Sequence, residues 1–80
     1  MTFEVYVAEY PGDEWWMSFA GAIGAPDDKL ESVAAALMGA GSAGWFSTRI
    51  PALQGKTPQE VLSTEPKGLF IVRTVLGRMP

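Results

Sequence analysis

The strongest constraint in this sequence is a helix-start signal at Thr57. Proline follows directly, at the first helical position, where its missing N–H is harmless because that group has no partner inside a helix. Glu60 comes three residues after Thr57, so the two can form a capping box in which each side chain accepts a hydrogen bond from the other's backbone N–H. Gly55 permits a tight turn just before the cap. The sequence therefore predicts a turn followed by a short helix from Pro58.

Two longer helices are predicted on either side of this signal. Upstream, Asp28 can cap a helix over 29–38, with Glu31 completing a second capping box and a glycine ending the helix. Downstream, a helix over 65–77 is apolar nearly all round, so we expect it at the centre of the core or covered by a partner. The glycine-rich segment 39–44 is predicted to be a flexible linker. The alternative, a helix that continues through it to Phe46, is less favoured because three glycines cost about 1 kcal/mol each relative to alanine.

The N-terminal residues predict a β-hairpin. Phe3, Val5 and Val7 alternate with their neighbours at period two, which is typical of a strand with one buried face. A Pro-Gly-Asp turn follows, and the alternation then resumes. We therefore expect two strands between about Thr2 and Ala20. The predicted fold is α+β, a small single domain over 1–80 with this N-terminal hairpin followed by three helices.

Size and composition exclude several classes of function. The chain has 80 residues, enough for one domain, and 48% of them are hydrophobic, which argues against disorder. Cysteine and histidine are absent, which removes disulfides, the usual zinc ligands and the commonest general base. No apolar run approaches the about 20 residues of a membrane-spanning helix, and the N-terminus lacks a signal-peptide pattern. We expect a cytoplasmic protein that is not an enzyme, uses no cofactor or metal and contacts no membrane.

Charge is distributed unevenly along the chain. The net charge is −3, but residues 1–44 carry seven acids and one base, whereas residues 45–80 carry five bases and two acids. We therefore divide the domain into an acidic ββα part over 1–40 and a basic helical part over 45–80. Two interpretations stay open: the halves face each other or are simply solvated, or the basic half meets a partner.

Two aromatic positions are candidates for contact with a partner. In the predicted strand, Trp15 and Trp16 point to opposite faces, so Trp16 is a candidate for an exposed binding anchor. The alternative is that helices cover both rings. Trp45 is expected in the domain core, with the loop from Ser47 to Lys56 near the partner.

An ordered set of residues in the C-terminal half carries a family resemblance. A tryptophan is followed by an apolar residue, Gly-Lys-Thr-Pro, a leucine, a turn and a helix that ends in Leu-Gly-Arg. The positions are Trp45, Leu53, Gly55, Lys56, Thr57, Pro58, Leu62, Thr64, Gly68, Val72, Leu76, Gly77 and Arg78. This order resembles the C-terminal toxin-binding domain of the Xre/MbcA/ParS antitoxins, over about residues 45–79.

The resemblance implies protein binding without chemistry by this chain. Members of the family bind and block a cognate toxin of the RES type, which degrades NAD, and longer members add a helix-turn-helix domain that binds operator DNA. The predicted hairpin is unlike that domain, and the family's tail beyond Gly-Arg-Ile is not matched, since this chain stops at Pro80. We therefore expect contact through the loop and the last helix. The candidate partner-binding residues are Trp45, Arg49, Leu53, Lys56, Arg73, Arg78 and Trp16.

Three further possibilities remain at this stage. An adaptor from a phage or mobile element would keep the domain but bind a different host protein. A small helix-turn-helix nucleic-acid binder would use the short helix and the last helix, although the acidic total charge opposes this because phosphate binding needs a concentrated basic face. The sequence also allows a homodimer.

Overall fold

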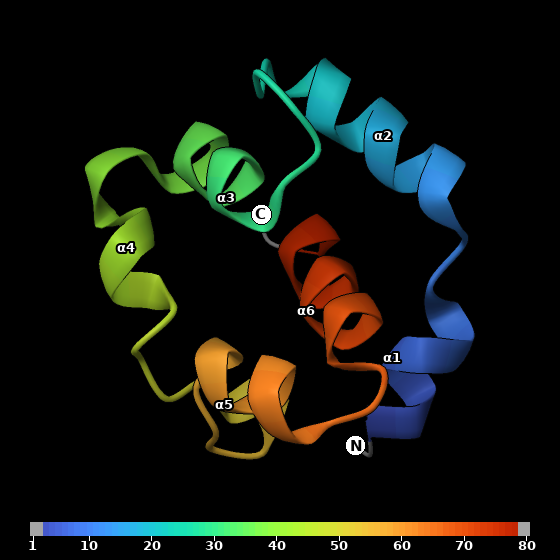
Figure 1. The fold of residues 1–80 in the computed structure, drawn as a ribbon, viewed down its shortest axis with the longest axis vertical. Coiled ribbons are helices and arrows are strands. Elements are labelled where there is room, and N and C mark those ends of the chain that lie inside the picture. Colours follow the sequence, from blue (N-terminus) through green and yellow to red (C-terminus); the bar gives the residue numbers. More distant parts are fainter. Residues whose placement is uncertain (1–2, 79–80) are drawn as a thin grey trace.

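Helix α6 (Gly68–Gly77) lies in the middle of the fold, and the other helices surround it (Figure 1). The computed structural model describes residues 3–78. Val72 and Leu76 are fully buried in α6, and Ile71 is 2% exposed. The expectation that an all-round apolar helix lies at the centre of the core is therefore confirmed.

The other elements form a ring around α6. Figure 1 shows α1 and α2 on one side of α6 and α3, α4 and α5 on the other. In chain order the elements are α1 (Phe3–Glu9), α2 (Asp13–Ala22), α3 (Leu30–Met38), the 3-10 turn η1 (Gly39–Gly41), α4 (Ser42–Trp45), the 3-10 turn η2 (Pro51–Leu53), α5 (Pro58–Thr64) and α6. No helix within residues 3–78 has the length and apolar character needed to cross a membrane.

The predicted β-hairpin between Thr2 and Ala20 is wrong. From residue 3 onward this segment forms α1 and α2, and residue 2 lies outside the described part of the chain. Residues 3–78 contain no sheet, and their β-structure is limited to an isolated bridge between Ile50 and Lys56. The fold class is thus all-helical rather than α+β, and the acidic part is not a ββα unit.

The N-terminal apolar residues fit a helical period as well as an alternating one. Phe3, Tyr6, Val7 and Tyr10 recur at i, i+3, i+4 and i+7, which places them on one helix face. Tyr6, which the strand pattern put on the polar side, is 5% exposed. The predicted hairpin turn becomes the connection between α1 and α2, in which Gly12 has φ 125° and stands at the N-cap position of α2. Packing against α6 selects the helical alternative.

Helix α5 forms as the sequence predicts. Thr57 Oγ1 accepts a hydrogen bond of 3.1 Å from the Glu60 backbone N–H, and the Thr57 backbone N–H donates to Glu60 Oε1 at 3.3 Å. The capping box is therefore complete, with Pro58 at the first helical position. Gly55 makes the preceding turn with φ 77°.

The other helix boundaries differ from the prediction by a few residues. Helix α3 begins after Lys29 and has no side-chain cap, so the expected capping box of Asp28 is absent. Instead, the Lys29 backbone N–H donates to Asp27 Oδ1 at 2.9 Å. Helix α6 begins at Gly68 rather than at 65, because Pro66 restricts Glu65 to extended backbone (φ −96°, ψ 132°).

The segment 39–44, expected to be a linker, is largely helical. Gly39 ends α3 with φ 66°, as predicted, but the chain then forms η1 and enters α4. Thr48 Oγ1 donates to the Gly44 carbonyl oxygen at 2.7 Å and so extends the ordered turn beyond α4. The segment therefore directs Trp45 toward the core rather than separating two units.

Gly68 marks the close approach of α6 to α5, and it generates a test of the packing. A Cβ atom at this position would collide with the Val61 carbonyl oxygen and lie 3.0 Å from Leu62 Cα, both backbone atoms of α5. We expect Gly68→Ala to lower the free energy of unfolding by about 1–3 kcal/mol, as measured by urea denaturation.

The matched control is Gly21→Ala in α2, where an added Cβ meets nothing within 4 Å. Gly21 lies in the last turn of α2, so this change should leave the free energy of unfolding unchanged or raise it by up to about 0.5 kcal/mol, because alanine has the higher helix propensity. A Gly68→Ala protein at least as stable as wild type would show that α5 and α6 do not pack as described.

Candidate functional site

The connection between α4 and α5 is a compact loop anchored at its middle. Leu53, in η2, is fully buried. The Ile50 backbone N–H donates to the Lys56 carbonyl oxygen at 3.1 Å, and the Gly55 N–H donates to the Ile50 carbonyl oxygen at 3.1 Å. Gln54 takes the left-handed conformation with φ 59° to close the turn. The loop is therefore held in one shape by its own backbone and by one buried leucine.

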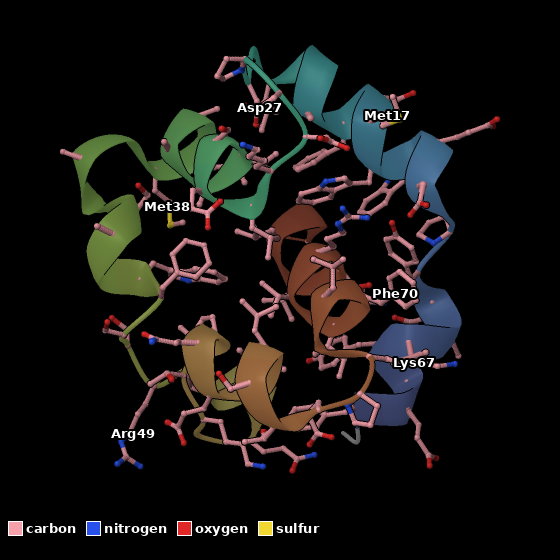
Figure 2. All side chains as sticks on the ribbon, viewed as in Figure 1. Met17, Asp27, Met38, Arg49, Lys67 and Phe70 are labelled. Carbon is pink, nitrogen blue, oxygen red and sulfur yellow. The ribbon has the colours of Figure 1, made fainter. Side chains whose placement is uncertain are left out.

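Arg49 is the outward-pointing cation of this loop. Figure 2 shows its side chain extending away from the fold, and the residue is exposed. Within residues 3–78 Arg49 makes no hydrogen bond, ion pair or ring contact. An unpaired guanidinium on a rigid loop is available for bidentate hydrogen bonding to a carboxylate.

Trp45 and Lys56 lie at the two ends of the loop and are partly buried. The Trp45 ring meets Phe46 edge-on at 5.2 Å with an interplanar angle of 81°, and both rings pack against the buried core. Lys56 Nζ lies 3.8 Å from Glu65 Oε1 and 5.7 Å from the centre of the Phe3 ring. Trp45 therefore sits at the edge of the core, and Lys56 is tied to neighbouring elements.

Arg73 on α6 is engaged inside the fold. Its Nη1 donates to the Tyr10 hydroxyl at 2.8 Å and lies 3.2 Å from Asp13 Oδ1. The guanidinium also stacks over the Trp16 ring, 5.0 Å from the ring centre, and the side chain is only 13% exposed. Arg73 thus joins α6 to the connection between α1 and α2, and its Nε is buried without a hydrogen-bond partner.

Tyr10 completes this cluster. Its hydroxyl donates to Asp13 Oδ1 at 2.8 Å, and its ring stacks on Phe70 at 4.6 Å. Burial raises the pKa of the Tyr10 hydroxyl above its usual value, and the hydrogen bond to Asp13 acts in the same direction, while Arg73 opposes them. The phenol therefore stays protonated and keeps its donor role at neutral pH.

Arg78 pairs a charge of the basic C-terminal half with one of the acidic N-terminal half. This residue pairs with Glu9 and lies over the Tyr6 ring at 5.6 Å. Together with the pair of Arg73 and Asp13, it links the basic half to the acidic half. The two halves therefore face each other across the contact of α6 with α1 and α2, which supports the first of the two interpretations of the charge pattern.

Trp16 lies in the core rather than on the surface. Its side chain is 0% exposed, and Nε1 donates to the Asp28 carbonyl oxygen at 2.7 Å. The case for an exposed anchor depended on the strand pattern, which does not form. Among residues 3–78 the exposed large apolar side chains are instead Met17, at 60%, and Leu69, at 41%. Sequence reasoning missed Met17 because an alternating strand would have buried it.

The structure therefore brings some of the predicted residues together and separates others. The loop region contains Trp45, Arg49, Leu53 and Lys56. Arg73, Arg78 and Trp16 belong instead to the contacts between the C-terminal part of the chain and the N-terminal helices. No group of three or more acidic, histidine or cysteine residues within 3–78 could hold a metal ion.

One family of known proteins matches the chain. The family model described as the antitoxin Xre/MbcA/ParS C-terminal toxin-binding domain matches residues 31–79, more than half of the sequence. This match confirms the resemblance and extends it upstream, because it begins in α3 rather than at Trp45. Searches found no matching curated protein and no matching solved structure.

The different roles of Arg73 in α6 and Arg78 directly after it can be measured. Arg73→Met keeps an apolar stem but loses the contacts to Tyr10, Asp13 and Trp16, so we expect the free energy of unfolding to fall by about 1.5–3 kcal/mol.

The matched substitution is Arg78→Met, which breaks an ion pair whose side chains are 46% and 43% exposed. Water and salt screen such a pair, so its loss should change the free energy of unfolding by at most about 1 kcal/mol. If urea denaturation gave the same loss in the free energy of unfolding for both variants, Arg73 would not make the stabilising buried contacts described above.

Proposed function

The chain belongs to the antitoxin Xre/MbcA/ParS family through its C-terminal toxin-binding domain, and from that premise we propose that it binds and inhibits a RES-type, NAD-degrading toxin. The observation that carries the proposal is the family match over residues 31–79, since the family's domain is a toxin-binding one. The inhibition involves binding alone, with no reaction catalysed by this chain. Because the proposed target consumes NAD, we also propose that the protein acts in the cytoplasm.

We propose the loop from Ser47 to Lys56 as the toxin-contacting surface. The loop lies within the matched residues, and most of its side chains are exposed. Its backbone is already fixed by the buried Leu53 and by the hydrogen bonds that Ile50 makes with Lys56 and Gly55, so little conformational entropy would be lost on binding. A preformed loop of this kind supports tight association better than a flexible one.

Arg49 is the central contact in this proposal. Its guanidinium has no partner within the described chain, so binding would not have to break an internal ion pair. Trp45 and Lys56 flank it as half-buried residues that can contribute at the rim. Leu53, Arg73 and Trp16 act indirectly, because their burial lets them support the surface but not touch a partner.

The fold gives no support to the helix-turn-helix alternative. Helix α6, which would have to serve as the reading helix, buries Ile71, Val72 and Leu76 in the core. A reading helix must instead present polar side chains to the major groove. The adaptor alternative differs from the proposal only in its target, so the binding experiment decides between them.

The direct test measures NAD loss by a purified RES-type toxin with increasing amounts of this chain. We expect stoichiometric suppression of NAD loss and a stable complex in size-exclusion chromatography. Arg49→Glu reverses an exposed, unpaired charge, so it should weaken the dissociation constant by at least about tenfold, or 1.4 kcal/mol, without changing the melting temperature.

The matched control is Lys67→Glu, the same charge change at an exposed residue outside the loop. Figure 2 shows Lys67 and Arg49 on different sides of the molecule. This variant should bind within about twofold of wild type. Normal binding by Arg49→Glu would reject the loop as the contact surface. No complex and unchanged NAD loss with the wild-type chain would reject toxin inhibition, and a complex with an unrelated protein would favour the adaptor.

A further inference from the structure

After the internal ion pairs are formed, the negative charge that remains is concentrated around α2 and the start of α3. Residues 1–28 contain no basic side chain. Glu9 forms an ion pair with Arg78, and Asp13 forms one with Arg73. The carboxylates left without an ion-pair partner within residues 13–31 are Glu14, Asp27, Asp28 and Glu31, and Lys29 is the base in this stretch. This end of the molecule is therefore acidic, although the charges between the N-terminal helices and the C-terminal part of the chain are paired.

A groove of about 350 Å³ lies beside α2 at the same end. Its lining residues are Met17, Ala20, Gly21, Ala25, Asp27 and Asp28. The Met17 side chain is 60% exposed, against 41% for Leu69. Around Gly21 the groove is open, since an added Cβ would meet no atom within 4 Å. The groove thus combines an exposed, flexible apolar side chain and small residues with two carboxylates.

We propose that this α2 groove docks a basic amphipathic segment of a partner protein. An apolar side chain of that segment would pack on Met17, whose unbranched thioether adapts to different shapes. Lysine or arginine side chains on the same segment would face Asp27 and Asp28, which line the groove, and this charge complementarity selects a basic occupant over a neutral or acidic one. The apolar contact and the opposite charges are both needed, because exposed ion pairs alone contribute little to the free energy of binding.

The α2 groove is separate from the proposed toxin-binding loop. Met17, Asp27 and Asp28 precede the family match, which begins at residue 31. Figure 2 shows Met17 and Asp27 at one end of the molecule and Arg49 at the other. A second protein in the groove would therefore leave the loop free, so the inference goes beyond toxin inhibition and can fail or hold independently of it.

The test uses three labelled peptides of equal length and the full chain. The probe is a helical peptide of leucine and lysine with the leucines on one face. One control peptide has serine in place of leucine, and the other has glutamate in place of lysine. We expect the leucine–lysine peptide to bind at least about tenfold more tightly than either control. Its binding should shift the amide resonances of Met17, Gly21 and Ala25.

Two variants of α2 sharpen the test. Met17→Lys removes the apolar contact and adds a positive charge, so it should weaken binding of the leucine–lysine peptide by at least about tenfold. Ser18→Lys makes the same charge change at the exposed neighbour, which does not line the groove, so binding should weaken by only about two- to threefold. Both positions are exposed, so both variants should fold like wild type, and Met17→Lys should still suppress NAD loss by the toxin.

Several results would overturn the inference. Equal binding of the serine–lysine peptide would show that only unspecific charge attraction operates. Equal weakening by Met17→Lys and Ser18→Lys, or resonance shifts centred on Arg49, would place the peptide elsewhere. Loss of toxin binding in Met17→Lys would show that the groove belongs to the toxin-binding surface of this chain and is not a second site.

Discussion

The burial of α6 is the constraint on which the rest of the structure depends. This helix carries apolar side chains on nearly every side, so it is stable only when other elements enclose it. A chain of 80 residues has few elements to spare, and α5, α1 and α2 each cover part of α6. Glycine is needed at the start of the helix, because a Cβ atom at Gly68 would collide with backbone atoms of α5, and at the other end a Cβ atom at Gly77 would require the Trp15 ring to shift.

This enclosure explains how the N-terminal helices relate to the toxin-binding domain. The family match begins at residue 31, yet α6 packs directly on α1 and α2, which precede it. Arg73 and Arg78 are directed toward Asp13 and Glu9; Arg73 is thereby largely withdrawn from the surface, whereas the Arg78 side chain stays 46% exposed. Of the basic residues in the C-terminal half, Arg49 is then the one that a rigid, exposed loop presents outward.

Local signals made part of the fold predictable. The capping box at Thr57, the stop at Gly39 and the apolar length of 65–77 act over a few residues, and each corresponds to an observed helix start, helix end or central helix. The prediction for the N-terminal segment was wrong because its apolar residues are so frequent that both a strand period and a helix period fit them. Only packing against a helix more than 60 residues later decides between the two, as the contact between Arg73 and Tyr10, 63 residues apart, illustrates.

The same limit applies to the candidate site. The family resemblance could be predicted from the sequence, whereas the internal roles of Arg73 and Trp16 could not, because their partners lie far away in the chain. The role of Arg49 as a partner contact stays a prediction. Amide hydrogen exchange of this chain, alone and mixed with a RES-type toxin, tests the central claim most directly. The account predicts new protection over residues 47–56, with exchange in α1 and α2 unchanged. Protection confined to α1 and α2, or no change anywhere in the chain, would contradict it.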